Sequence, residues 1–327
     1  MPRRLTVRTE IWPLREPFAI SRGVKTAAEV VVAEIADGAV VGRGEGVPYP
    51  RYGETVAGVR DAVRAQEMAI TQGLDRAGLA QAVPAGAARN ALDCALWDLE
   101  AKQAGKPVWM LAGLSRPTSV PTFDTIGLDT PEAMAAMAMR KSAWPLLKIK
   151  LGRDAILDRV RAVKAAAPRA RLIVDPNEAW TIDDLKTVAP DLARLGVEMI
   201  EQPVSAKDDA GLAGYASPVA LCADEACHTV DDVARLKGRY TVVNIKLDKT
   251  GGLTGALNLA VAAKAAGFRL MVGCMVSTSL SIAPALLVAG DAAFVDLDGP
   301  RWLTKDREAG LRFADGAVAP AEAALWG

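Results

Sequence analysis

Eight ionisable residues close short apolar segments between residues 148 and 298 of this 327-residue sequence. They are Lys148, Lys150, Asp175, Glu201, Asp224, Lys246, Asp296 and Asp298. A single charge at the end of a strand is usually a solvated surface group, but charges that end so many successive segments favour one shared site. Carboxylates that converge repel each other unless a cation lies between them. The acidic residues therefore predict a bound metal ion, and the lysines predict groups that give or take a proton.

A repeating pattern of strands and helices must position these residues. Predicted strands begin roughly 22 to 27 residues apart, which leaves room for a strand, a turn and a helix of three turns. The stretches 154–167 and 254–266 between them are alanine-rich, with leucine and valine at helical spacing. The predicted strands are Val120–Thr125, Leu146–Lys150, Arg171–Asp175, Val197–Glu201, Val219–Asp224, Val242–Lys246, Arg269–Gly273 and Ala293–Asp298. Eight such units favour a closed β/α barrel over an open α/β sheet, which remains the alternative on pattern alone.

The N-terminal part of the chain shows another pattern. Val30–Ile35 and Ala39–Gly44 resemble a strand pair around the Asp37-Gly38 turn. Helices are predicted over 54–72 and 87–104, the second with one apolar stripe. This part is therefore a small α+β unit that precedes the barrel. The last residues of the chain contain no barrel unit, and we expect them to pack back against this N-terminal unit.

In a closed barrel, the order of the strands in the sequence predicts which strand ends are neighbours. Active sites of such barrels lie at the carboxyl ends of the strands. Strands three, four and five are neighbours, so Asp175, Glu201 and Asp224 should converge. Ligands that are all oxygen favour Mg²⁺, with Mn²⁺ as a possible substitute. Strands two and six face each other across the barrel mouth, which places Lys150 and Lys246 on opposite sides of the metal.

Two lysines on opposite sides of a bound substrate suggest a mechanism. One lysine removes a proton from carbon and the other returns a proton to the opposite face, which inverts that carbon. A lysine beside a divalent cation has a reason to titrate low and act as a base. The metal would hold a substrate carboxylate and stabilise the enediolate formed when the α-proton leaves. The alternative is that the lysines only form salt bridges with the carboxylates.

Composition excludes several other classes of protein. Thirty-nine basic and 39 acidic residues cancel, so the sequence predicts no nucleic-acid partner and no membrane partner. The longest apolar stretch, residues 280–289, is far shorter than the ~20 residues of a membrane span. Four cysteines without a CxxC motif suit a reduced, cytoplasmic location. Gly42–Gly46 lacks the lysine of a phosphate-binding loop, and the oligomeric state stays open, with a homo-oligomer possible.

Five segments resemble the enolase superfamily in order and spacing. They are residues 148–150 (Lys-Ile-Lys), 173–177, 200–203, 223–225 and 244–252. Within the superfamily they look like the muconate-lactonizing subgroup, which has a lysine on each side of the site. The resemblance implies an N-terminal α+β capping domain (1–113), a modified (β/α)7β TIM-like barrel (114–302) and a C-terminal segment (303–327) that returns to the capping domain.

The same resemblance assigns roles to residues. It implies Mg²⁺ on Asp175, Glu201 and Asp224, with Lys150 and Lys246 as the acid/base pair. Lys148 would lie next to the substrate carboxylate and help to hold it. The residues that would support the metal and Lys246 from outside are Asn177, Glu225 and Asp248.

Asp296 and Asp298 bear on the substrate. They lie two positions apart and so point to the same side of a strand. Two more carboxylates suit an anionic substrate only if they meet a positive group, and the free α-ammonium of a dipeptide is such a group. This Asp-x-Asp resembles that of dipeptide epimerases. The alternatives are a pair that caps the following helix, and an N-acylamino acid racemase, cycloisomerase or o-succinylbenzoate synthase-type lyase of the same superfamily.

Three N-terminal segments narrow the resemblance further. Residues 17–23, 48–54 and 86–98 are similar to those of L-Ala-D/L-Glu epimerases of murein-peptide recycling. The likeness implies that Arg22 pairs with the glutamate side chain of a small dipeptide substrate and that Thr125 touches the same residue. Arg22 could equally be a solvated loop charge. Ser277 stands where many dipeptide epimerases have glutamate, which leaves the pocket around Cys274 and the substrate preference open.

Overall fold

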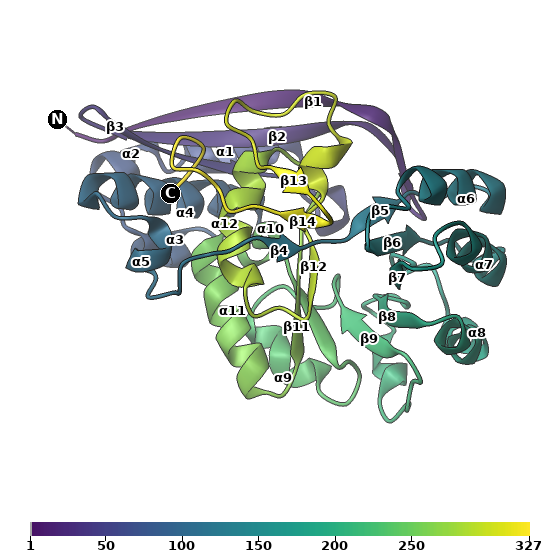
Figure 1. Ribbon diagram of the computed structural model, residues 1–327. Helices are drawn as coiled ribbons and strands as arrows, with labels where there is room; N and C mark the ends of the chain where they lie inside the picture. The colour runs from purple at the N-terminus through teal and green to yellow at the C-terminus, as the bar shows by residue number, and fades with distance from the viewer. Residues whose placement is uncertain (1) are drawn as a thin grey trace.

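The computed structural model describes residues 2–327 of the chain. An antiparallel sheet of three strands forms its N-terminal part, in the order β1 (Arg4–Ile20), β2 (Gly23–Asp37) and β3 (Val40–Gly46). The predicted turn around Asp37 and Gly38 joins β2 to β3. Sequence patterns missed β1, because only Leu5 of this strand is buried and its apolar signal is weak. Figure 1 shows the long β1–β2 hairpin extending over the barrel towards β5 and β6.

Helices cover one face of this sheet. They are α1 (Val56–Arg64), α2 (Glu67–Thr71), α3 (Arg76–Ala82) and α4 (Ala87–Ala104), and the short η1 (Pro50–Tyr52) precedes them in the chain. The predicted helix 54–72 is thus two helices, whereas α4 has its predicted bounds. Helix α3 was not predicted; its first turn is capped by Asp75, which accepts a hydrogen bond from the Gly78 N–H.

Helix α4 packs directly on strand β3 through glycine. A Cβ atom at Gly42, Gly44 or Gly46 would lie 2.1 Å from the carbonyl oxygen of Ala95, Ala91 or Ala87, respectively. Only glycine therefore allows the two backbones to approach so closely. The glycines of residues 42–46 therefore permit this packing. The side chains of the residues between them point away from the contact with α4.

Eight parallel strands form the second sheet, in sequence order from β5 to β12. They are β5 (Asp124–Ile126), β6 (Leu146–Lys150), β7 (Arg171–Asp175), β8 (Val197–Glu201), β9 (Ala220–Ala223), β10 (Val242–Ile245), β11 (Arg269–Gly273) and β12 (Phe294–Asp296). The Phe123 N–H donates to the Val295 carbonyl at 2.8 Å, which brings the two edges together into a nearly closed barrel. The predicted fold class is confirmed.

The predicted first strand, Val120–Thr125, is divided in the structure. Its start is β4 (Val120–Pro121), which pairs with β14 (Ala317–Val318) instead of entering the barrel. Strand β14 pairs in turn with β13 (Phe313–Ala314). The barrel strand β5 therefore begins only at Asp124.

Connections between barrel strands cover the outside of the barrel, as Figure 1 shows for α6 to α8. Five are helices of ten or more residues: α6 (Pro131–Arg140), α7 (Ile156–Ala166), α8 (Ile182–Arg194), α11 (Leu253–Ala265) and α12 (Ser279–Ala289). Shorter elements are α5 (Val108–Leu111), η2 (Asp209–Leu212), η3 (Val230–Asp232), α9 (Val233–Leu236), α10 (Leu247–Thr250) and η4 (Gly299–Trp302). The barrel interior below the site is filled by Phe123, Leu146, Ile173, Met199, Cys222, Val242, Met271 and Phe294.

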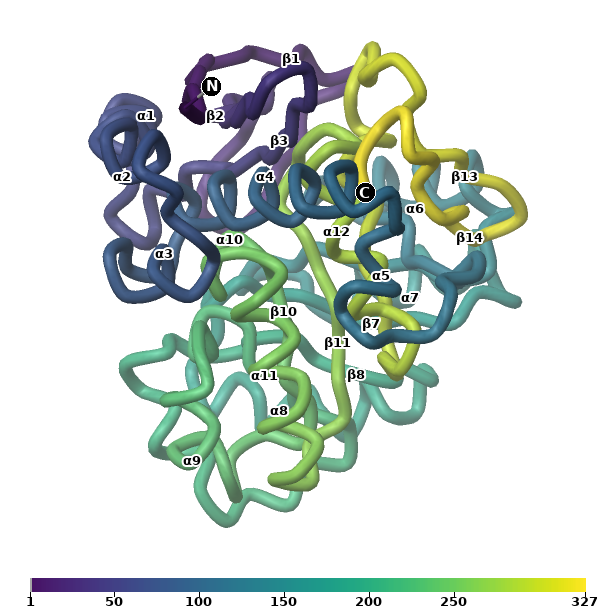
Figure 2. Tube along the Cα trace, turned by 90° about the vertical axis from the view of Figure 1, so that its left-hand side faces the viewer, coloured from purple at the N-terminus to yellow at the C-terminus, as the bar shows by residue number. Residues whose placement is uncertain are grey.

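The C-terminal segment lies beside α4 (Figure 2). Trp326 donates its indole N–H to the Cys94 carbonyl at 3.0 Å, and the Arg43 guanidinium donates to the carbonyls of Ala324 and Leu325. These contacts join the end of the chain to the N-terminal unit.

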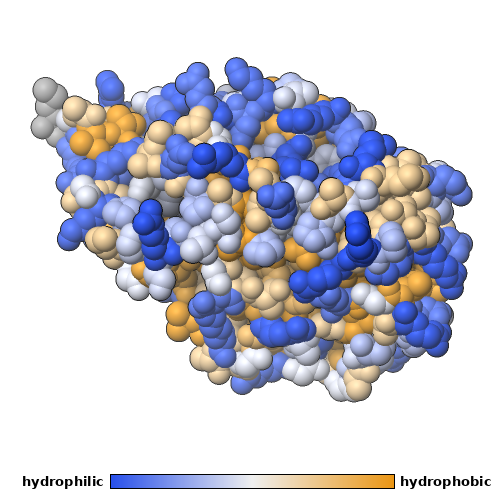
Figure 3. All heavy atoms as spheres, in the orientation of Figure 1, coloured by the Kyte–Doolittle hydropathy of each residue, from blue (hydrophilic) through white to orange (hydrophobic). Residues whose placement is uncertain are grey.

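No helix within residues 2–327 combines the length and apolar character needed to cross a membrane. On the face seen in Figure 3, hydrophilic side chains are interspersed with small hydrophobic patches.

Candidate active site

A pocket of ≈ 460 Å³ opens at the carboxyl ends of the barrel strands, beneath the β1–β2 hairpin. The barrel contributes side chains from strand ends, and the N-terminal unit contributes residues 18–25 and 49–51. Lining residues from the barrel include Thr125, Lys148, Lys150, Asn177, Asp224, Glu225, Lys246, Cys274, Asp296 and Asp298. Most of the residues predicted from the sequence therefore face one cavity.

Asp175, Glu201 and Asp224 lie at or just after the ends of adjacent strands, and all three are buried. Lysine ammonium groups link them. Lys148 Nζ lies 2.6 Å from Glu201 Oε2 and 3.2 Å from Asp175 Oδ2. Lys246 Nζ lies 2.7 Å from Asp224 Oδ2 and 3.9 Å from Glu201 Oε1. The three carboxylates thus form one cluster with Glu201 at its centre.

Charge within this cluster is distributed unevenly. Burial would raise the pKa of Asp175, but attraction to Lys150 and Lys148 lowers it to about 2. Burial, followed by repulsion from Asp175, raises the pKa of Glu201 to about 6. Burial opposes the charge of Asp224 as well, yet Lys246 and Lys249 hold its pKa well below the usual range. Of the three carboxylates, Glu201 is therefore the one whose pKa is raised.

Among residues 2–327, no three His, Cys, Asp or Glu side chains stand in a ready-made metal-binding arrangement. The lysine ammonium groups described above already contact these carboxylates. Two features nevertheless fit a hard divalent cation. The donor groups are carboxylate oxygens from neighbouring strand ends, and Glu201 Oε2 is buried without a hydrogen-bond donor although Lys148 Nζ is close.

Lys150 and Lys246 approach the pocket from well-separated strands, β6 and β10. Lys150 Nζ donates to Asp175 Oδ2 at 2.6 Å, and Lys246 follows the last residue of β10. Burial would lower the pKa of Lys246, but Asp224 and Glu201 raise it above its ordinary value. The nearest charges of Lys246 here are carboxylates, whereas the low titration expected from the sequence depends on a bound divalent cation and stays a prediction.

Asp296 and Asp298 both line the pocket, as expected of a pair on one side of a strand end. Asp296 Oδ2 accepts from Lys148 Nζ at 2.7 Å, and its Oδ1 is buried without a hydrogen-bond donor among the described residues. Asp298 Oδ2 accepts from the Thr125 N–H and from the Trp302 indole. Burial and repulsion from Asp296 raise the pKa of Asp298 to about 6. Two carboxylates, Asp296 and Asp298, thus lie close enough at this end of the pocket to repel each other.

Arg22, at the tip of the β1–β2 hairpin, is not a solvated loop charge. Its guanidinium donates to the Asn177 carbonyl at 2.7 Å, to the Tyr49 hydroxyl at 2.9 Å and to Glu225 Oε1 at 2.7 Å. Lys25 lies nearby in the same lining, with its ammonium 5.1 Å from the centre of the Tyr49 ring. In the described part of the chain, no carboxylate lies within 4.0 Å of the Lys25 ammonium.

The three expected supporting residues have different surroundings. Asn177 donates its backbone N–H to Asp175 Oδ1 and accepts from Lys150 Nζ. Glu225 accepts from Arg22, and burial followed by repulsion from Asp224 raises its pKa to about 7. Asp248 differs from the expectation, because its carboxylate accepts from the Val47 N–H and the Asn90 amide of the N-terminal unit, not from Lys246.

Residues around strand β11 contribute little polar chemistry. Cys274 lines the pocket, where burial raises the pKa of its thiol well above the ordinary value. Ser277 donates its hydroxyl to the Met275 carbonyl and is fully buried. His228 packs edge-on against Tyr52 and its pKa is lowered to about 4 by burial and by Lys249, so it is a neutral packing residue near pH 7.

Sequence reasoning missed two buried residues of the site. Lys249 is 1% exposed and donates to Asp224 Oδ1 at 2.6 Å. Asn244 donates its amide to Glu201 Oε1 at 2.8 Å. Both belong to the 244–252 segment, and a strand position two residues before Lys246 could have indicated Asn244, because alternate residues share a face. No local signal indicates Lys249.

A barrel beneath a separate N-terminal sheet, with lysines beside a carboxylate cluster at the strand ends, is the arrangement that the resemblance to the enolase superfamily predicted. The chain belongs to the enolase superfamily: residues 3–113 match the mandelate racemase / muconate lactonizing enzyme N-terminal domain, and residues 132–324 match the enolase C-terminal domain-like family. The family resemblance predicted from the sequence is confirmed. Enzymes of this group named in the comparisons below are racemases and epimerases, which are isomerases.

Two curated relatives cover nearly the whole chain. It is 47% identical over 318 residues to the L-Ala-D/L-Glu epimerase of Escherichia coli K12, with 97% of this chain and 99% of the relative covered. It is 45% identical over 300 residues to an N-acetyl-D-glutamate racemase of Pseudoalteromonas, with 91% and 95% covered.

Two solved structures are also similar throughout. An enolase family member from Agrobacterium tumefaciens with homology to dipeptide epimerases, solved with sodium and L-Ala-L-Glu, has a TM-score of 0.97 and 48% identity over 100% of both chains. A dipeptide epimerase from Enterococcus faecalis, solved with Mg and L-Leu-L-Tyr, has a TM-score of 0.91 and 31% identity, with 98% of both chains covered.

Proposed function

We propose that this chain is a Mg²⁺-dependent dipeptide epimerase that inverts the α-carbon of the C-terminal residue, with L-Ala-D/L-Glu of murein peptide metabolism as its substrate. The observation that carries the proposal is the charge distribution of one pocket. Two lysines on separate strands flank its centre, while Asp296 and Asp298 make one end negative. Such a pocket suits a substrate with a carboxylate at the reacting centre and an ammonium group beyond it.

Asp175, Glu201 and Asp224 would hold the metal ion. A divalent cation bound there supplies electrostatic stabilisation to the substrate carboxylate as negative charge develops on it. Bound dipeptide together with Mg in the Enterococcus faecalis epimerase supports this assignment. In this chain, the burial of Glu201 between the two other carboxylates supports it as well.

Lys150 and Lys246 would carry the proton transfer. One ε-amino group accepts the α-proton, and the other, as ammonium, donates a proton to the opposite face of the same carbon. Asp175 and Asp224 orient these amines through hydrogen bonds at 2.6 and 2.7 Å. Because the lysines approach from different strands, a carbon between them can be protonated on either face.

The negative end of the pocket would bind the α-ammonium of the N-terminal residue. Asp296 Oδ1 has no donor among the described residues, and Asp298 is 5% exposed, so both would gain from a buried cation. Lys148, between Asp296 and Glu201, would keep the adjacent substrate carboxylate in place.

The other end of the pocket, at the hairpin tip, would bind the side-chain carboxylate of the epimerised glutamate. Arg22 was expected to pair with this carboxylate and Thr125 to touch the same residue, but the Thr125 N–H donates to Asp298 Oδ2 at the negative end. Because the Arg22 guanidinium already bonds to Asn177, Tyr49 and Glu225, we assign the carboxylate to Arg22 and Lys25 together.

N-acylamino acid racemisation is the second candidate. The relative from Pseudoalteromonas, named an N-acetyl-D-glutamate racemase, favours it at 45% identity. An N-acetyl group has no positive charge, so it would supply no cation to Asp298 or to the undonated Oδ1 of Asp296. The charge at this end of the pocket therefore supports a dipeptide over an acylated amino acid.

Proton NMR in D₂O tests the proposal. With L-Ala-L-Glu and Mg²⁺, epimerisation exchanges the α-proton of the C-terminal residue and produces the L,D form. Turnover of N-acetyl-L-glutamate at the same or greater kcat/KM would replace the dipeptide assignment with the racemase. Formation or loss of a double bond in a muconate or succinylbenzoate-type substrate would instead indicate a lyase or cycloisomerase.

A further inference from the structure

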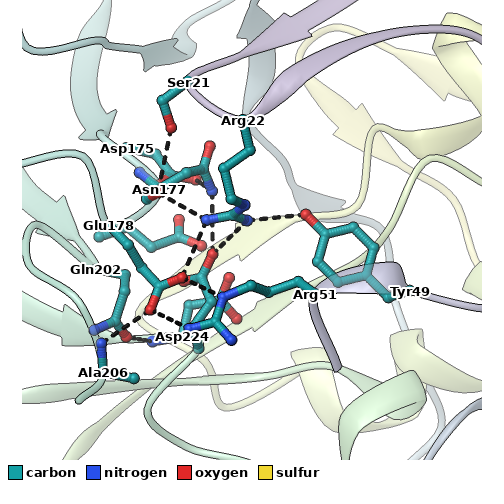
Figure 4. Close-up of polar contacts among 12 residues, drawn as sticks. Ser21, Arg22, Tyr49, Arg51, Asp175, Asn177, Glu178, Gln202, Ala206 and Asp224 are labelled. Atoms are coloured by element: carbon teal, nitrogen blue, oxygen red, sulfur yellow. Dashed lines mark hydrogen bonds and ion pairs between the residues drawn. The ribbon is translucent and has the colours of Figure 1, made fainter. Parts of the chain in front are cut away.

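Two arginines from the N-terminal unit end on the same barrel loop. Arg22 lies at the β1–β2 turn, and Arg51 lies in η1, the second segment above the pocket. Figure 4 shows both guanidinium groups pointing at the loop after β7, where Glu178 is located. The nearest Arg22 nitrogen is 3.4 Å from Glu178 Oε2.

The contact between Arg51 and Glu178 is bidentate. Arg51 Nε donates to Glu178 Oε2 at 2.7 Å, and Nη2 donates to Oε1 at 2.8 Å. The Glu178 side chain is only 8% exposed, whereas that of Arg51 is 32% exposed. A forked pair of charged hydrogen bonds around a buried carboxylate is stronger than an ordinary surface salt bridge.

The barrel holds Glu178 firmly on its side of this contact. Its Oε1 also accepts from the Ala206 N–H at 2.9 Å, and its own N–H donates to the Gln202 carbonyl. Asn177 and Glu178 both have left-handed backbones, with φ of 48° and 68°. Such conformations cost free energy in residues other than glycine and persist only where surrounding contacts fix them.

Arg22 is tied to the same loop by other bonds. Ser21 donates its hydroxyl to the Pro176 carbonyl at 2.9 Å, and Arg22 donates to the Asn177 carbonyl. Glu225 Oε1 accepts a hydrogen bond from Nη2 of the Arg22 guanidinium. The hairpin tip therefore has several hydrogen bonds to the barrel, whereas the 49–53 segment contacts the barrel through the Arg51–Glu178 pair and the packing of Tyr52 on His228.

We propose that Glu178 is a positioning residue that fastens the 49–53 segment over the pocket, through a bidentate pair with Arg51, and steadies Arg22 beside it. It touches no reacting atom. The inference rests on the closed arrangement of the site to which the proposed function also belongs.

Limited proteolysis measures this fastening without any substrate. Trypsin cleaves after Arg51, Arg22 and Lys25, so all three bonds report on the segments above the pocket. In Glu178→Gln, the amide oxygen can still accept from the Ala206 N–H, but the charged fork is lost. We expect cleavage after Arg51 to accelerate about tenfold, the ratio that corresponds to ~1.4 kcal/mol, with a smaller increase after Arg22.

A matched control exists on the opposite end of the barrel. Arg171 and Glu198 form another bidentate pair, with both distances 2.7 Å, at strands β7 and β8. Glu198→Gln therefore removes a similar pair far from the pocket and should leave cleavage after Arg51 at the wild-type rate. Circular dichroism and melting temperature verify that both variants are folded.

The pair is tested independently with Arg51→Lys, which retains the charge and the trypsin site but not the fork. It should accelerate cleavage like Glu178→Gln, and the double variant should be no faster than the faster single variant. Rates that multiply in the double variant, or wild-type cleavage in folded Glu178→Gln, would overturn the proposal. These outcomes are independent of epimerase activity. Accelerated cleavage in an enzyme that fails to turn over dipeptides would sink the proposed function alone.

Discussion

Lys150 and Lys246 line the same pocket although they stand on strands separated by three others in the sheet. Each ammonium is held by a different buried carboxylate, Asp175 or Asp224. This arrangement allows the two amines to have opposite duties at one carbon atom. It also means that neither can replace the other, because moving between the two positions would require crossing the barrel mouth.

Lys150→Ala and Lys246→Ala should therefore each abolish epimerisation. One variant should still exchange the α-proton of a single epimer with solvent, since the remaining lysine reaches one face of the carbon. Deuterium incorporation from D₂O, followed for L,L and L,D substrates separately, measures this. Lys264→Ala, at an exposed pair with Asp291, is the control. If either site variant interconverts both epimers at the wild-type rate, the two-base mechanism is wrong.

Removal of the metal should stop turnover without unfolding the barrel. After EDTA treatment and dialysis, we expect activity to be lost and to return with Mg²⁺. Asp224→Asn should weaken Mg²⁺ binding measured by calorimetry and abolish turnover, because it removes a carboxylate from the cluster. Full activity of the wild type after exhaustive chelation would contradict the metal assignment.

Substrate charge should be recognised at both ends of the pocket. Asp298→Asn and Asp296→Asn should each lower kcat/KM for L-Ala-L-Glu by about 10- to 150-fold, which corresponds to roughly 1.5–3 kcal/mol for a shielded charged hydrogen bond. N-acetylation of the dipeptide should have a similar effect on the wild type. Comparable rates for free and acetylated substrates would exclude this role of the aspartates.

The hairpin cations should distinguish acidic from apolar dipeptides. Arg22→Ala and Lys25→Ala should each reduce turnover of L-Ala-L-Glu far more than that of L-Ala-L-Leu, because only glutamate leaves a carboxylate unpaired. The ratio of the two kcat/KM values is the measure. If the ratio is unchanged in Lys25→Ala but changes greatly in Arg22→Ala, Arg22 is the sole partner of the glutamate carboxylate.

Stability should depend on the ionisation of Asp93, which lies on α4 and accepts two hydrogen bonds from Thr254. Burial raises its pKa from 3.8 to about 6. An acid whose pKa is raised by folding binds its proton more tightly in the folded state, so its contribution to stability falls as pH rises from about 4 to above 6. A shift of two units is worth roughly 3 kcal/mol.

The difference in unfolding free energy between wild type and Asp93→Asn should therefore change with pH. The variant should gain stability relative to the wild type between pH 4 and pH 7.5 in denaturant titrations. Asp158→Asn is the control, since the Asp158 side chain is 68% exposed. A difference that stays constant across this range would rule out ionisation of Asp93 as a determinant of stability.

Barrel strands could be predicted to the residue where a charged side chain ends an apolar run, as at Lys150, Asp175 and Glu201. The local sequence therefore indicates both where the strand ends and which charged residue stands there. Strand β1 escaped prediction because its residues lie on the surface. Partners of Arg22 and Glu178 lie up to 203 residues away in the sequence, so only the folded chain reveals them. The partners of Asp248, Val47 and Asn90, are likewise distant in the sequence.

Strand β3 alternates between glycines, at which no side chain fits, and residues with charged side chains. Two strand residues advance ~6.6 Å and four helical residues ~6.0 Å, so Gly42, Gly44 and Gly46 meet Ala95, Ala91 and Ala87 of α4 in step. The side chains between them, Arg43 and Glu45, bind the C-terminal segment and Arg307. When a random library over residues 42–46 is selected for folding alone, it should therefore return glycine at every second position. A one-residue deletion in this strand should be the least tolerated change.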